Sequence, residues 1–176
     1  MIRKAEKEDI GAVSASYLEL FAYEAIHGSR TNWQPGLYPS ETTAQAAFED
    51  GTLYILRDNH VFCGSMILNH IQPPEYGEIP WHYTGDSAEI LVLHTLCIPP
   101  SQKGKGYGRQ LIAFAIQYAS QIGCKAVRLD TWVGNHPAAA LYEKMGFRLA
   151  GTAPMLLQGA IREQQIFFER KVGETK

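Results

Sequence analysis

The sequence predicts a mixed α/β (α+β) protein, and three observations support this prediction. Helical and strand-like hydrophobic patterns alternate along the chain, a glycine-rich turn joins a strand-like run to a helical one, and 45% of the 176 residues are hydrophobic. A chain of this length can close one ordinary core, so we expect a single domain over residues 1–176. The formal net charge of -2 leaves no large basic field, which argues against nucleic acid and membrane surfaces as partners.

The first 51 residues predict two helices with a loop between them. Apolar residues recur at helical spacing from Ile10, and Asp9 stands where a cap or a first-turn acid is favoured. The stretch 27–39 is rich in Gly and Pro and carries aromatic residues, which indicates a loop. Ser40 is placed to cap a second, short helix that ends near Gly51.

Two β-rich runs follow, at 52–57 and 61–71. The polar residues 58–60 separate them, which is the pattern of an antiparallel hairpin. Residues 72–87 then contain three prolines and several aromatic residues, so we predict a long loop. Loops of this length inside a compact domain are usually functional or mobile.

The second half of the chain predicts a β-α-β unit, a short helix and a final hairpin. The elements expected in order are a strand at 88–98, a helix at 107–122, a strand at 126–133, a short helix opening at Pro137, and strands at 147–157 and 160–170.

The segment Gln102-Lys103-Gly104-Lys105-Gly106-Tyr107-Gly108 predicts an anion-binding turn. Glycines at alternate positions let the backbone N–H groups point inward, and the following helix adds its own unpaired N–H groups and the positive end of its dipole. Lys103, Lys105 and Arg109 reinforce the preference for an anion, which we expect to be a diphosphate. The spacing fits neither a Walker A loop nor a dinucleotide fingerprint.

Two segments resemble the motifs of one family. Residues from Leu96 to Arg109 resemble the acetyl-coenzyme A motif of the GCN5-related N-acetyltransferase (GNAT) superfamily, and residues from Asn135 to Phe147 resemble its second hallmark. The resemblance implies a twisted mixed sheet of six or seven strands flanked by about four helices, in which the fourth and fifth strands splay apart to form a cleft. One position departs from the motif, because Lys103 stands where the superfamily usually has Arg or Gln.

The resemblance also implies an activity and a set of site residues. The chain would transfer the acetyl group of acetyl-CoA directly to a primary amine in a ternary complex, with Tyr142 protonating the departing thiolate. Ordinary packing is the alternative for Tyr142, and helix capping is the alternative for Asn135. The implied coenzyme-binding residues are Leu96, Cys97, Ile98, Lys103, Gly104, Lys105, Gly106, Tyr107, Gly108, Arg109, Asn135 and Tyr142.

A general base and an acceptor site are harder to place. His94 shares strand parity with Leu96 and Ile98, and the ordinary pKa of a histidine suits a base, so it is the candidate catalytic base, with an ordinary sheet histidine as the alternative. Glu89 has the opposite parity and is the weaker candidate. The expected acceptor contacts are the aromatic residues Trp33, Tyr38, Trp81 and Tyr83, with Glu24, Glu41 and Asp86 available to attract a cationic amine.

The remaining expectations concern alternatives, compartment and partners. A non-catalytic acyl-CoA sensor is the second hypothesis, and a small molecule or a peptide would supply the amine to a monomer or homodimer. Cys63, Cys97 and Cys124 lack metal-ligand spacing, so we expect no metal and treat them as buried hydrophobic residues and not acyl carriers. The charged amino terminus does not resemble a signal peptide, and a reducing cytoplasm is the expected location.

Overall fold

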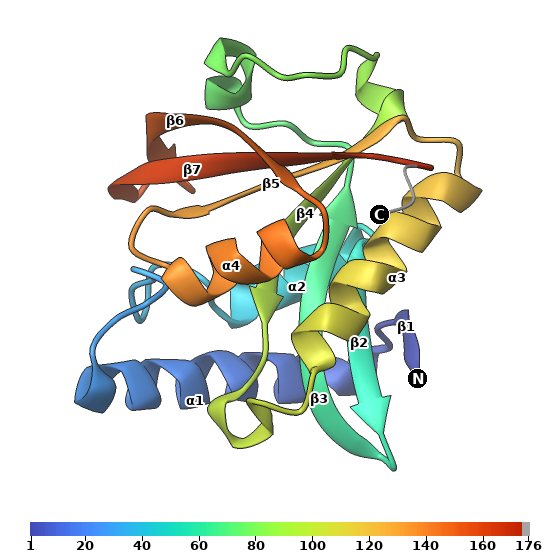
Figure 1. Cartoon of the computed structure of the whole chain (residues 1–176). Coiled ribbons are helices and arrows are strands. Elements are labelled where there is room, and N and C mark those ends of the chain that lie inside the picture. Colours follow the sequence, from blue (N-terminus) through green and yellow to red (C-terminus); the bar gives the residue numbers. More distant parts are fainter. Residues whose placement is uncertain (174–176) are drawn as a thin grey trace. The chain divides into compact units, whose positions relative to one another are not determined.

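The structure is a computed structural model that describes residues 1–173 (Figure 1). The described residues form a seven-stranded mixed sheet with strand order β1-β2-β3-β4-β5-β7-β6 and four α-helices, as the sequence predicted. The chain divides into two compact units, each assembled from two chain segments. Unit 1 comprises residues 1–68 and 94–111, and unit 2 comprises residues 69–93 and those from 112 onward.

Unit 1 contains an antiparallel strand group with two helices against it. The strands are β1 (Ile2–Lys4), β2 (Leu53–Asp58) and β3 (Val61–Asn69), and the helices are α1 (Ile10–His27) and α2 (Glu41–Glu49). The core of this unit is formed by apolar side chains from α1, α2, β2 and β3, among them Val13, Tyr17, Ala44, Ile55 and Ile67. The predicted helices and hairpin are therefore confirmed, whereas β1 was not predicted.

Asp9 ties β1 and β2 to the start of α1. Its carboxylate accepts hydrogen bonds from the guanidinium groups of Arg3 at 2.8 Å and Arg57 at 2.9 Å, and from the backbone N–H of Glu6 at 2.9 Å. Burial alone would raise the pKa of Asp9, but these hydrogen bonds and charges together lower it. At the second helix, Ser40 accepts a hydrogen bond from the N–H of Thr43, which confirms the predicted cap.

Unit 2 is built around three long strands. These are β5 (Ala126–Trp132), β6 (Arg148–Leu157) and β7 (Ile161–Lys171), with α4 (His136–Lys144) between β5 and β6 in the chain. β7 pairs antiparallel with both β5 and β6, and the β6–β7 hairpin turns at Gln158 and Gly159, as predicted. β4 (Ile90–Cys97) and α3 (Tyr107–Gln121) each have residues in both units, and the last residue of β3 belongs to unit 2. Within unit 2, β4 pairs in parallel with β5 through residues 90–92.

The segment 72–87 is less open than the sequence predicted. It contains a 3-10 turn at Pro74–Glu78, and a second turn begins at its end, at Ser87–Glu89. Buried side chains of β5 and β7 hold its backbone, through hydrogen bonds described below. Among residues 1–173, no helix is long and apolar enough to cross a membrane.

Candidate functional site

The turn between β4 and α3 in unit 1 has the backbone shape that an anion site requires. Gly104 and Gly106 both have a φ of 81°, a left-handed conformation that side chains with a Cβ rarely adopt. Both glycines are exposed, and a Cβ added to either would meet no atom within 4 Å. Glycine is therefore needed at these two positions for the left-handed backbone conformation, and not to make room for neighbouring atoms of unit 1.

The amide groups of this turn precede the hydrogen-bonding ladder of α3. The N–H of Gln110 donates to the carbonyl oxygen of Gly106 at 3.2 Å. The N–H groups of residues 104–108 come before this bond in the chain, at the N-terminal end of the helix. Lys103, Lys105 and Arg109 are exposed around the same backbone. Exposed cations beside amides at a helix N-terminus fit a phosphate or diphosphate group.

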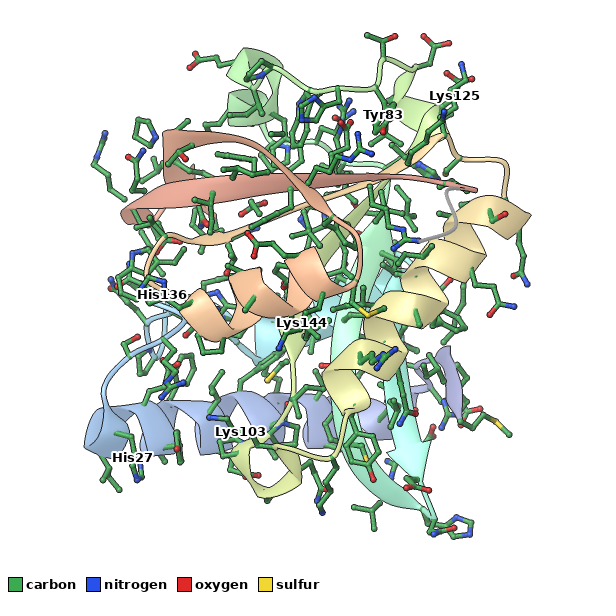
Figure 2. The ribbon with its side chains drawn as sticks, viewed as in Figure 1. His27, Tyr83, Lys103, Lys125, His136 and Lys144 are labelled. Atoms are coloured by element: carbon green, nitrogen blue, oxygen red, sulfur yellow. The ribbon has the colours of Figure 1, made fainter. Side chains whose placement is uncertain are left out.

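Side chains from other parts of unit 1 hold the turn in place. Glu19 of α1 accepts hydrogen bonds from the backbone N–H of Ser101 at 2.6 Å and from its hydroxyl at 3.2 Å. The hydroxyl of Tyr107 donates to Asp58 at 2.9 Å, which raises the pKa of Tyr107. Figure 2 shows Lys103 beside α1, where its ammonium lies 5.4 Å from the ring centroid of Tyr23. Sequence reasoning missed these supports because they join residues that are distant in the chain.

The carboxyl end of β4 has an irregular backbone at Thr95, where φ is 49°. His94, Leu96 and Ile98 are half-buried, and Thr95 and Cys97 between them are buried, so the predicted parity of His94 with Leu96 and Ile98 agrees with the burial pattern. A positive φ at a β-branched residue is uncommon and marks a local break in the strand. The catalytic role of His94 stays a prediction.

Cys97 is a core residue. Burial raises the pKa of its thiol to about 12, and the hydroxyl of Ser16 lies 3.7 Å from its sulfur. A thiol that stays protonated at neutral pH is a poor nucleophile, which agrees with the expectation that Cys97 is not an acyl carrier. Gly64 of β3 packs closely on this end of β4, because a Cβ at Gly64 would lie 2.5 Å from Ile98 Cδ1 and 2.9 Å from the carbonyl oxygen of Cys97.

Trp33 and Tyr38, two of the predicted acceptor contacts, lie together in unit 1. Their ring centroids are 5.9 Å apart in an edge-on arrangement. The Tyr38 hydroxyl is hydrogen-bonded to the Thr95 hydroxyl, and Tyr38 is buried while Trp33 is half-buried. The structure thus brings the predicted aromatic loop onto the irregular part of β4 within this unit.

Two acidic residues expected to be available to a cationic amine, Glu24 and Asp86, and the weaker base candidate Glu89 have local partners or roles in the structure. The carboxylate of Glu24 is buried and accepts four hydrogen bonds from Ser29, Arg30 and Thr31. Glu89 accepts a hydrogen bond from the backbone N–H of Asp86 and pairs with Lys125 at 2.8 Å. Glu24 and Glu89 therefore have structural partners, and Asp86 caps the 3-10 turn before β4. Glu41 is exposed at the start of α2. Attraction of an amine by Glu24, Glu41 or Asp86 stays a prediction.

In unit 2, the predicted proton donor Tyr142 is buried on α4. Its ring centroid lies 6.0 Å from that of Phe147 and 5.8 Å from that of Phe168. Burial raises the pKa of the Tyr142 hydroxyl, and the nearby charge of Asp130 raises it further. A hydroxyl in these surroundings stays protonated at neutral pH, which is the state that a proton donor needs.

Asn135 caps α4, as its alternative role predicted. Its side-chain oxygen accepts a hydrogen bond from the N–H of Ala138 at 3.4 Å, and its side-chain nitrogen donates to the hydroxyl of Thr131 at 3.2 Å. A coenzyme contact by Asn135 stays a prediction.

Asp130 of β5 is a residue that sequence reasoning missed. The hydroxyl of Tyr76 donates a hydrogen bond to its Oδ1 at 2.6 Å. Burial raises the pKa of Asp130 to about 6, although the Tyr76 hydrogen bond acts in the opposite direction. The available signal was an acidic residue at the end of an apolar strand, two positions after Arg128.

Trp81 and Tyr83 hold the 72–87 segment in the structure. The guanidinium of Arg128 lies 4.3 Å from the ring centroid of Trp81, and the indole N–H of Trp81 donates to the carbonyl oxygen of Tyr76 at 2.7 Å. Arg128 also donates to the carbonyl oxygen of Tyr83 at 2.6 Å. The ring of Tyr83 borders a surface pocket of about 440 Å³ that also has Lys125 and Lys171 in its lining; Figure 2 labels Tyr83 and Lys125 at this end of unit 2. Acceptor contacts by Trp81 and Tyr83 stay predictions.

The candidate residues thus form two groups, one in each unit. Unit 1 brings together the glycine turn, the carboxyl end of β4 and the aromatic pair Trp33 and Tyr38. Unit 2 brings together Tyr142, Asp130 and the anchored segment 72–87.

Comparison with known proteins gives a consistent result. Residues 19–147 match the model of the acetyltransferase (GNAT) family. The uncharacterized N-acetyltransferase YhfO of Bacillus subtilis is 38% identical over 148 residues, which are 83% of this chain and 88% of YhfO. The mycothiol acetyltransferase of Kocuria rhizophila is 38% identical over 64 residues, 36% of this chain, and the chain spans only 21% of its length.

Solved structures share the fold. An acetyltransferase of the GNAT family from Streptococcus agalactiae aligns with a TM-score of 0.83 over 99% of this chain and 96% of its own, at 17% identity. The Salmonella typhimurium protein yncA, whose structure was solved with its cofactor acetyl-CoA, aligns with a TM-score of 0.70 over 100% of this chain and 95% of its own, at 18% identity.

Proposed function

The chain belongs to the GNAT family of acetyltransferases, and from this premise we propose that it transfers the acetyl group of acetyl-CoA directly to a primary amine. The observation that supports acetyl-CoA use best is the turn at Gly104 and Gly106, whose open backbone and exposed cations fit the coenzyme diphosphate. The structure of yncA with acetyl-CoA supports the same choice of coenzyme.

We assign the coenzyme to residues of unit 1. The amides of residues 104–108 and the side chains of Lys103, Lys105 and Arg109 would hold the diphosphate, and the backbone of Leu96 and Ile98 would pair with the pantetheine arm. Bound acetyl-CoA supplies an activated acyl carbon and a thiolate leaving group.

The side chains of the protein would then supply a proton to the sulfur and remove one from the amine. The hydroxyl of Tyr142 would donate its proton to the sulfur, and its buried surroundings keep that proton in place until then. The acceptor must lose a proton before it attacks, at a cost of about 4 to 5 kcal/mol for a lysine-like amine and about 1 kcal/mol for an α-amino group at pH 7. His94 is our candidate for a base on β4. Transfer through Cys97 is disfavoured because its thiol is buried and protonated.

Coenzyme binding tests this proposal first. Isothermal titration calorimetry with acetyl-CoA should show micromolar binding to the parent protein and none to Gly106→Glu, which places bulk and negative charge in the turn. Gly11→Ala is the matched control, because Gly11 lies near the start of α1 and a Cβ there meets nothing within 4 Å. A well-folded parent that does not bind acetyl-CoA would contradict the proposal.

Turnover is the second test. A panel of primary amines, from small molecules to peptides with a free amino terminus, should release coenzyme A thiol in the presence of the parent protein. Two further features stay proposals. A cytoplasmic location agrees with the three cysteines being free and buried, and the chain would act as a monomer or a homodimer.

A further inference from the structure

Asp130 is a partly buried carboxylate with one polar partner. Tyr76 is its hydrogen-bond partner among the residues that the structure describes, and none of the ion pairs found there involves Asp130. A buried charge normally has an oppositely charged partner, since its removal from water is otherwise unfavourable. The surroundings of Asp130 are therefore those of a carboxylate whose positive partner would be a bound ligand.

The charged and titratable groups around Asp130 come from the 72–87 segment, from α4 and from β5 itself. From the 72–87 segment, Tyr76 donates its hydroxyl, and Glu75 adds a second negative charge nearby. From α4, Tyr142 is close enough for the charge of Asp130 to raise its pKa. Arg128 stands two residues away in the same strand, but its guanidinium is already bound to Glu169, Gln72 and the carbonyl oxygen of Tyr83.

The side chains beside Asp130 are aromatic. Asp130 is the register partner of Phe167 across β5 and β7. The Phe167 ring centroid lies 5.4 Å from that of Tyr76 and 6.1 Å from that of Trp81. The guanidinium of Arg128 already covers the ring of Trp81 at 4.3 Å, so Tyr76 and Phe167 are the aromatic neighbours left for a ligand. Aromatic side chains next to a carboxylate favour an organic cation over a hydrated metal ion, because they can attract an ammonium group and pack against its carbon atoms.

We propose that Asp130, in place of His94, binds the ammonium group of the acceptor and removes its proton, so that the acceptor of this enzyme is a cationic primary amine. This inference rests on the proposed acetyltransferase function and deepens it. The residue would touch the reacting nitrogen, and Tyr76 would position it through the 2.6 Å hydrogen bond.

The protons and electrons balance. Asp130 takes one proton from the ammonium, and the freed lone pair forms the new C–N bond as the thioester C–S bond breaks. The sulfur leaves with the electron pair of that bond and receives the proton of Tyr142. The nitrogen loses a second proton to solvent, Tyr142 regains a proton from solvent, and Asp130 releases the proton it took. One ammonium and one thioester thus give one amide, one thiol and one proton.

The protonation states of the two residues suit these roles. With a pKa of about 6, Asp130 is ionised at pH 7 to 8 and yet basic enough to accept a proton. Burial, and then the charge of Asp130, keep Tyr142 protonated over the same range. A base and an acid whose surroundings move their pKa values apart are typical of catalytic pairs.

The first test is direct and needs no coenzyme. The carboxyl carbon resonance of Asp130 is followed by NMR in the full chain, with n-butylammonium chloride as the probe and n-butanol as the uncharged control. At pH 7.5, n-butylammonium should shift the resonance saturably and n-butanol should not. In a pH titration, Tyr76→Phe should raise the pKa of Asp130 and Glu75→Gln should lower it. No saturable shift with n-butylammonium would overturn the inference.

The second test separates this inference from the proposed function. Asp130→Asn should bind acetyl-CoA within about twofold of the parent by calorimetry, while its rate of n-butylamine acetylation falls at least about 100-fold and the rise in rate near pH 6 disappears. Glu78→Gln is the matched control, because it removes one exposed carboxylate from the same 3-10 turn as Tyr76. Circular dichroism establishes that each variant is folded.

The outcomes are distinguishable. A parent that fails to bind acetyl-CoA contradicts the proposed function, and the NMR titration still decides whether Asp130 binds an amine. A parent that acetylates n-butylamine, together with an Asp130→Asn variant that keeps both rate and pH profile, contradicts the role of Asp130 alone.

Discussion

The Nε atom of Arg128 lies 3.0 Å from Oε1 of Glu169, and the two side chains are only 7% and 0% exposed. This pair connects β5 and β7 to the 72–87 segment. Arg128 donates to the carbonyl oxygen of Tyr83, and Glu169 accepts hydrogen bonds from the backbone N–H groups of His82 and Tyr83. The segment that carries Tyr76 is thus fixed by a buried ion pair.

Arg128→Met should destabilise the protein by about 3 to 5 kcal/mol, because it leaves the charge of Glu169 buried without a partner. Urea denaturation monitored by circular dichroism measures the loss. The double variant Arg128→Met/Glu169→Leu is the control, and it should recover much of the stability because no unpaired charge remains. A double variant as unstable as the single one would show that the hydrogen bonds to the segment matter more than the buried charge.

Asp130→Asn should stabilise the protein at neutral pH. The pKa of Asp130 is raised to about 6 in the folded state, against about 3.9 in an unfolded chain, so the unfolded state loses its proton first as the pH rises. The stability that Asp130 contributes is present below pH 4 and is lost between about pH 4 and pH 6. The variant lacks this loss. The free energy of unfolding of the variant minus that of the parent should therefore be up to about 3 kcal/mol larger above pH 6 than at pH 4. Urea denaturation at pH 4, 5, 6 and 7.5 checks the pH dependence, and a constant difference across this range would contradict it.

Tyr142→Phe should lower turnover by about 10- to 10⁴-fold while acetyl-CoA binding stays close to that of the parent. The substitution removes a proton donor and keeps the ring contacts with Phe147 and Phe168. Steady-state kinetics and calorimetry on the same preparation measure both effects. Unchanged turnover would remove Tyr142 from the mechanism, and a parent that binds acetyl-CoA but acetylates no amine would favour the sensor hypothesis.

Glu19→Ala should weaken acetyl-CoA binding with little effect on folding. Glu19 accepts two hydrogen bonds from Ser101, so its loss leaves the backbone before Gly104 less ordered. Because these bonds are exposed to solvent, the change in stability should be about 1 kcal/mol or less. Calorimetry gives the affinity, with Glu8→Ala as the control for loss of an exposed acid before α1. Equal affinities for the two variants would mean that the turn keeps its shape without Glu19.

The order of elements could be predicted because the signals are local. Hydrophobic periodicity, the cap at Ser40 and the turn at Gln158 and Gly159 each lie within one element or at its end. β1 escaped prediction because its three residues, Ile2 to Lys4, are too few to show a period. Its position in the sheet depends on pairing with β2, more than 50 residues later.

The candidate site was predictable in part for the same reason. The glycine turn and the segment around Tyr142 are contiguous motifs, so a sequence can show them. Asp130 acquires its surroundings from Tyr76, 54 residues earlier in the chain, and from burial that only the folded unit creates. Glu24 shows the same limit, since its four hydrogen bonds from Ser29, Arg30 and Thr31 depend on how the loop folds back on α1, which the sequence pattern does not show.

The four hydrogen bonds at Glu24 separate the two halves of the loop between α1 and α2. They fix residues 29–31 to the end of α1, and Tyr38 at the far end of the loop is held by Thr95. Residues 34–37 lie between these two attachment points and are exposed. Backbone hydrogen bonds close this stretch, because the N–H of Gln34 donates to the carbonyl oxygen of Tyr38 and the N–H of Tyr38 donates to the carbonyl oxygen of Gln34, both at 3.0 Å. Exposed side chains on this closed turn can therefore be exchanged without loss of its backbone bonds, except at Gly36, whose φ of 77° favours glycine.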